Sequence, residues 1–186
     1  PKKFQQLMQL VELCKEGKIQ PHILRVMSSN GEISPLVSSD IEHVLSGTSI
    51  VPKFKDMQEA ISGSLEGDVV NVAGRLLVRS EDELKELKMD EKTYLELFEP
   101  IKRFAFAQGR LGDCYLVSAL SDFMRNPKAR IKLYEMFEQK GDDVIVRIPD
   151  MPEFPINFAS KKVPLEGSKH IEGSLGIKML ENAYAQ

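Results

Sequence analysis

The stretch Gln108-Gly109-Arg110-Leu111-Gly112-Asp113-Cys114-Tyr115 decides how this chain is interpreted. Its two glycines permit a tight turn with positive φ. Asp113 is suited to cap a helix whose first turn contains Cys114. At that position the helix dipole favours the thiolate and lowers the pKa of the thiol. We therefore predict that Cys114 is an activated nucleophile at the tip of a helix.

The residues on either side of the turn complete this prediction. Gln108 lies six residues before the cysteine, where its amide can donate a hydrogen bond to an oxyanion formed by thiolate attack. The apolar residues after the cysteine fall on one face of the expected helix and predict that this face is buried. They are Leu116, Val117, Ala119, Leu120 and Phe123.

The composition excludes several classes of protein. The net charge is -3 and the charged residues are scattered, so no basic surface for nucleic acid is expected. No apolar run is long enough to span a membrane, and the first 20 residues do not resemble the core of a signal peptide. The two cysteines, Cys14 and Cys114, make neither a disulfide framework nor a four-ligand zinc site. Few cysteines and no leader favour a reducing, cytoplasmic environment.

The periodicity of apolar residues predicts a mainly helical chain with some strand. We expect helices at 4–18, ending near Gly17, and at 38–47, 55–65, 80–100, 116–126, 129–141 and 174–186. The helix at 80–100 is expected because Ser80 and Glu83 form a capping-box pattern. Residues 68–80 are expected to be strand or buried loop. Prolines in 142–167 predict a hairpin or a small edge-type sheet there.

The stretch around the cysteine resembles the active-site sequence of the calpain family, Gln-Gly-x-Leu-Gly-Asp-Cys-Trp, and matches it at six of seven fixed positions. Tyr115 stands where the family has tryptophan. A second segment, Leu180-Glu181-Asn182-Ala183-Tyr184-Ala185, is similar to the family's Leu-Glu-Lys-Ala-Tyr-Ala helix and follows at the expected distance. The resemblance covers residues 95–186 well and residues 49–94 by position only.

This resemblance implies an α+β fold, namely the cysteine-bearing first lobe of a papain-like protease core with a small antiparallel sheet after the cysteine helix. It implies that residues 49–186 form the protease lobe. Residues 1–48 show no match to the family and are expected to form an N-terminal helical extension. The extension is open to interpretation as a docking element, a propeptide or extra core helices. The implied substrate is a protein or peptide, and the implied catalytic residues are Cys114 and Gln108. A histidine base and an orienting asparagine are expected from a second lobe that this chain does not contain.

The chain differs from the family at the positions of the histidine base and of the calcium ligands. His22 and His43 precede the cysteine, and His170 lies in an expected loop, so none of the three is expected to act as the base. Asn126-Pro127 is interpreted as a helix stop and not as the orienting asparagine.

In the family, a calcium-binding Asp and a Glu occupy positions that here are Ala105 and Ser174. Loss of both oxygen ligands predicts no calcium site of the family's type and no other cofactor. The turn at 28–34 faintly resembles a calcium loop, but almost none of the ligand positions before its glycine are acidic, so no calcium binding is expected there.

Two alternatives to a peptidase lobe stay open. One is a non-catalytic interaction domain that keeps the calpain-like scaffold, although such a scaffold needs neither Cys114 nor Gln108. The other is a papain-like acyl transferase that uses the same thiolate on a different acceptor.

Overall fold

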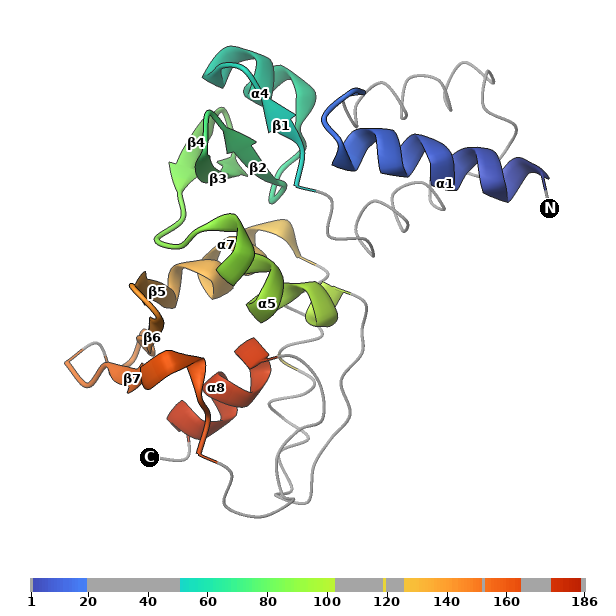
Figure 1. Cartoon of the computed structure of the whole chain (residues 1–186). Coiled ribbons are helices and arrows are strands. Elements are labelled where there is room, and N and C mark those ends of the chain that lie inside the picture. Colours follow the sequence, from blue (N-terminus) through green and yellow to red (C-terminus); the bar gives the residue numbers. More distant parts are fainter. Residues whose placement is uncertain are drawn as a thin grey trace. The chain divides into compact units, whose positions relative to one another are not determined.

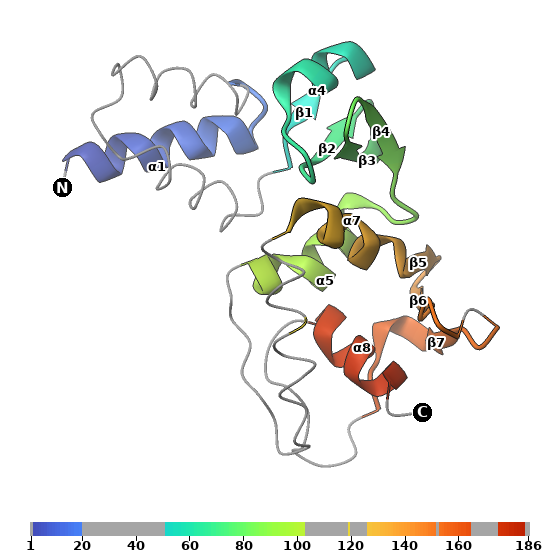
Figure 2. The same cartoon turned by 180° about the vertical axis from the view of Figure 1, so that it is seen from behind.

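The computed structural model describes residues 2–19, 51–102, 119, 126–151, 153–164 and 175–184. It is an α+β protein that divides into two compact units, Pro1–Glu86 and Leu87–Gln186 (Figure 1; Figure 2 from behind). The expected domain boundary at 48/49 lies outside the described residues. Each unit has helices, a small sheet and buried apolar side chains of its own.

The first unit contains helix α1 (Lys2–Lys15) and a four-stranded sheet with helix α4 (Met57–Gly63) beside it (Figure 1). The sheet has the order β1-β2-β3-β4, formed by Lys53–Phe54, Val69–Val72, Arg75–Ser80 and Glu83–Glu86. The β1–β2 pair is parallel and the other pairs are antiparallel. Apolar side chains from the sheet and from α4 form its core: Phe54, Ala60, Val70, Val72 and Leu77.

Two of the expected helices in this unit are confirmed. Helix α1 ends where Gly17 adopts a φ of +74°, a conformation that glycine accepts without a steric penalty. Helix α4 begins at Asp56, whose carboxylate accepts the backbone N–H of Glu59 at 2.8 Å. The segment 68–80, expected to be strand or buried loop, is a β-hairpin. Its turn at Ala73-Gly74 has positive φ at both residues.

The helix expected at 80–100 is wrong over its first half. Ser80 and Glu83 do not cap a helix; they are partners in the β3–β4 hairpin. Glu81, between them, has a φ of +55°, which is turn and not helix geometry. Helix α5 (Glu91–Lys102) begins eleven residues after Ser80 and continues two residues past Pro100, where a stop was expected.

The second unit contains helices α5, α7 (Pro127–Glu135) and α8 (Leu175–Tyr184) and a three-stranded antiparallel sheet, β5-β6-β7. The strands are Phe137–Lys140, Asp143–Val146 and Ile156–Phe158, followed by a 3₁₀ turn at Ala159–Lys161. This confirms the small sheet expected after 142 and the helix expected at the C-terminal end. It also extends the sheet to include residues 137–140.

The helix expected at 129–141 is therefore too long. Helix α7 ends at Glu135, and the next residues pair with β6, with Phe137 opposite Val146. Gly141, expected to stop a helix, has a φ of +60° and turns the β5–β6 hairpin. Tertiary contacts have overridden local helix propensity here. Residues 137–140 pair with β6, and the Phe137 ring is buried against Phe98 with ring centroids 5.0 Å apart.

Aromatic side chains form the centre of the second unit. Tyr94 and Phe98 of α5 pack against Tyr134 of α7 and Phe137 of β5. All four are essentially fully buried, and three of their contacts are edge-on, the geometry that aromatic rings prefer. This cluster joins α5 to α7 and to the second sheet.

Candidate active site

Both predicted catalytic residues, Cys114 and Gln108, lie outside the described residues. The same holds for Ala105 and Ser174, which align with calcium ligands of the resembling family, and for His22, His43 and His170. These assignments therefore stay predictions. Ala119 is the single described residue between Lys102 and Asn126; its backbone is helical, but its side chain is exposed, contrary to the burial expected for it.

The segment that carries the predicted site is followed directly by a well-defined helix start. Asn126 has extended backbone, with φ -98° and ψ 115°, and its Oδ1 accepts the backbone N–H of Lys128 at 3.0 Å. Pro127 occupies the first helical position, where the missing N–H costs no hydrogen bond. The Asn126 side chain is thus the N-cap of α7. The helix that was expected to stop at this pair lies at 116–126, where only Ala119 and Asn126 are among the described residues.

The second segment that resembles the family forms part of helix α8. Its face toward the core is apolar and consists of Ile177, Met179, Leu180 and Ala183. Glu181 lies on the buried side too, with only 4% of its surface exposed, whereas Tyr184 is 47% exposed. Moving a carboxylate out of water costs free energy unless polar or charged partners replace the water. The surroundings of Glu181 must therefore offset this cost.

Helices α5 and α8 meet at Gly176. A Cβ atom built at this position would lie 2.7 Å from the backbone oxygen of Leu97 in α5, a distance that real Cβ contacts essentially never show. Only glycine therefore lets the two helices approach this closely.

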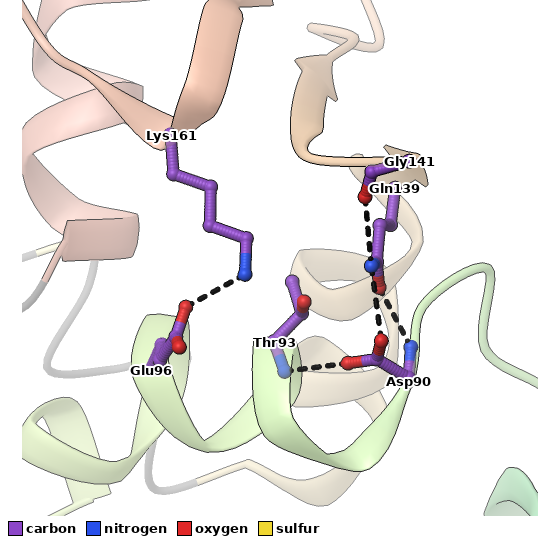
Figure 3. A network of polar contacts seen from close by, with 6 residues as sticks. All are labelled: Asp90, Thr93, Glu96, Gln139, Gly141 and Lys161. Carbon is purple, nitrogen blue, oxygen red and sulfur yellow. Dashed lines mark hydrogen bonds and ion pairs between the residues drawn. The ribbon is translucent and has the colours of Figure 1, made fainter.

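A polar network fixes the start of α5 to the second sheet (Figure 3). Asp90 is the N-cap: its Oδ1 accepts the backbone N–H of Thr93 at 2.8 Å. Gln139 of β5 binds the same residue twice, because its Nε2 donates to Asp90 Oδ2 at 3.0 Å and its Oε1 accepts the Asp90 N–H at 2.9 Å. Gln139 also donates through its backbone to the oxygen of Lys88 and through Nε2 to that of Gly141.

These contacts lower the pKa of Asp90 below its ordinary value. The largest cause is the hydrogen bond from the Thr93 backbone N–H; Gln139 and the positive charge of Lys161 act in the same direction, against a cost of partial burial. Asp90 therefore stays ionised at neutral pH and serves as an acceptor, not as an acid.

A second polar contact between α5 and the sheet region involves Lys161. Its Nζ lies 2.8 Å from Oε2 of Glu96 (Figure 3). Lys161 and Ser160 both have positive φ, at 58° and 50°, in a turn held by the Asp143 carboxylate, which accepts the Ser160 N–H at 2.9 Å. Both polar networks are structural in form: each satisfies backbone groups or joins elements, and neither presents a nucleophile.

Neither the cap at Asp90 nor its partner Gln139 is among the residues expected from the sequence. A signal for the cap was available, because an aspartate three residues before Thr93 fits an N-cap pattern. The capping-box spacing of Ser80 and Glu83 indicates an earlier helix start and conceals this signal. The Gln139 contact spans 49 residues of sequence and no local pattern indicates it.

Within the part of the chain that the structure describes, no group of three or more His, Cys, Asp or Glu side chains is arranged to hold a metal ion. Of the helices described, none combines the length and the apolar character that a membrane crossing requires. Cys14 is fully buried in α1.

Comparisons with protein-family models, with curated proteins and with solved structures each gave no match for this chain.

Proposed function

We propose that this chain is the nucleophile-bearing lobe of a calpain-like, papain-like cysteine endopeptidase. The observation that carries the proposal is the sequence Gln108-Gly109-Arg110-Leu111-Gly112-Asp113-Cys114, which joins a cysteine at an expected helix start to an amide donor across a glycine-bracketed turn. The match is specific, because the Leu-Gly-Asp that precedes the cysteine is not usual in papain-like enzymes outside calpains.

The chemistry proposed for these residues is acyl transfer through a thioester. The Cys114 thiolate attacks a peptide carbonyl, and the negative charge that develops on the carbonyl oxygen is received by the Gln108 side-chain amide and the Cys114 backbone N–H. Collapse of the tetrahedral intermediate breaks the C–N bond, and the amine leaves with a proton from a histidine. Water then hydrolyses the thioester. The histidine and its orienting asparagine are proposed to come from a second lobe that binds to this one.

The described residues agree with this proposal, although they do not include Gln108 or Cys114. The fold is α+β, a small antiparallel sheet follows the cysteine segment, and the segment Leu180–Tyr184 is helical with Glu181 and Ala183 buried. These are the element types that the resemblance implies, in the implied order. We further propose that the substrate is a protein or peptide and that this lobe uses no calcium or other cofactor. The proposed location is a reducing compartment.

The test is the pH dependence of alkylation of Cys114 by iodoacetamide. The measurement uses the Cys14→Ala variant, so that one thiol remains in the chain. An activated thiol gives a rate that rises through an apparent pKa below the ordinary value of about 8.5. The same variant unfolded in urea is the matched control and is expected to titrate near the ordinary value. A folded-state pKa equal to or above that of the unfolded control contradicts the proposal.

The role of Gln108 is tested separately with the Gln108→Ala variant. Alkylation has no oxyanion, so its rate is expected to stay within about twofold of the parent. Peptide hydrolysis is then measured with the proposed second lobe present. In that protein, Gln108→Ala is expected to hydrolyse peptides about a hundredfold or more slowly than the parent, the usual cost of removing an oxyanion donor. A completed protein with a reactive Cys114 but no hydrolysis of peptides favours the acyl transferase, and one with an unreactive Cys114 favours the scaffold.

A further inference from the structure

We draw no further inference here: the strongest candidate, the exposed apolar patch of Met151 and Phe154 in the connection between β6 and β7, carries nothing because nothing in the structure shows what covers it.

Discussion

At the scale of single residues, Asp90 joins the start of helix α5 to strand β5 of the second sheet. It caps α5 through Thr93 and is bound on its other side by Gln139. Replacement by alanine removes these two side-chain contacts and keeps only the bond from the backbone N–H of residue 90 to Gln139 Oε1. Loss of an N-cap alone typically costs about 1 kcal/mol. We therefore expect Asp90→Ala to lower the free energy of unfolding in urea by at least that amount. Ser62→Ala, an exposed change on α4 in the first unit, is the control and is expected to be nearly neutral. Equal stability of Asp90→Ala and the parent would show that the cap contributes nothing.

The ionisation of Asp90 gives a prediction with a definite sign. Because the folded-state pKa is lower than the unfolded value, the carboxylate stabilises the fold above the unfolded pKa of about 4, and this contribution is lost as the pH falls through the folded pKa. Asn caps helices as well as Asp, so Asp90→Asn keeps the bond from Thr93 but does not titrate.

We expect the parent to be more stable than Asp90→Asn at pH 7 and the difference to shrink below about pH 4, the ordinary aspartate pKa. The side chain is exposed, so solvent screening keeps the difference small. Thermal unfolding of both proteins across this range measures it. A gap that widens in acid would reverse the assigned direction of the shift.

Cys14 offers a third prediction at this scale. Its side chain has no exposed surface in the fold, so an alkylating reagent reaches it only after α1 separates from the residues that cover it. In the Cys114→Ala variant, we expect native protein to be alkylated at least tenfold more slowly than the same variant in urea, because opening of even 1.4 kcal/mol limits the open fraction to about a tenth. Mass spectrometry after timed quenching measures both rates. Equal rates would mean that α1 is not packed as described.

At the scale of elements, the sequence predicted those segments whose start and end signals are local. Helix α1 with its stop near Gly17, helix α4 and helix α8 were expected and are present. The errors occur where the pattern was right but its partner was distant. Ser80 and Glu83 have the spacing of a capping box, yet cross-strand pairing places them in a hairpin. Residues 137–140 continue a helical pattern, yet pair with β6. Such pairings depend on residues far along the chain, which a local window does not contain.

The contact between α5 and α8 gives a prediction in which two effects oppose each other. Alanine is a better helix former than glycine by about 1 kcal/mol, so helix propensity alone would make Gly176→Ala stabilising. The new Cβ, however, would lie 2.7 Å from the Leu97 backbone oxygen, and a helix backbone cannot move aside as a flexible side chain does. Overpacking of this kind costs about 1–3 kcal/mol.

We expect the clash to dominate and Gly176→Ala to be destabilising in urea denaturation. Lys178→Ala is the matched control, since it changes the same helix without adding an atom near α5, and it is expected to be close to neutral. A more stable Gly176→Ala variant would mean that the two helices are farther apart than described.

At the scale of the whole molecule, the α+β class was predictable from the sequence, because helical and strand-type patterns both occur in it. The four-stranded sheet was not predicted as a sheet. Its strands are short, its first strand has two residues, and the hairpin at 80–83 was concealed by a helix-start pattern. The assignment of the candidate site depends entirely on the sequence at 108–114. The described elements on either side of this segment are α5, which ends at Lys102, and α7, which is capped by Asn126. Cys114 and Gln108 therefore remain predictions that the alkylation and hydrolysis measurements decide.

The proposed calpain-like lobe has Ala105 and Ser174 at the two positions where the resembling family carries calcium ligands, and this predicts that calcium does not stabilise it. A ligand that binds only the folded state raises stability in proportion to the logarithm of its concentration over Kd, by about 2.7 kcal/mol at a hundredfold excess. With Ala105 and Ser174 in place of carboxylates, we expect added calcium to leave Tm unchanged relative to the same protein with chelator. Magnesium at equal concentration controls for ionic strength. A rise of several degrees with calcium alone would contradict this expectation.

The division into two compact units predicts that substitutions in one core act mainly on that unit. Leu77→Ala leaves a cavity in the core of the first sheet, and Phe98→Ala leaves one in the aromatic cluster of the second unit. Each is expected to cost about 2–5 kcal/mol. Native-state hydrogen exchange separates the two effects, because amides report the opening of their own cooperative unit. Leu77→Ala should accelerate exchange in β2 and β3 but not in α5 and β5, and Phe98→Ala should do the reverse. If both substitutions accelerate all four elements equally, the chain unfolds as one unit.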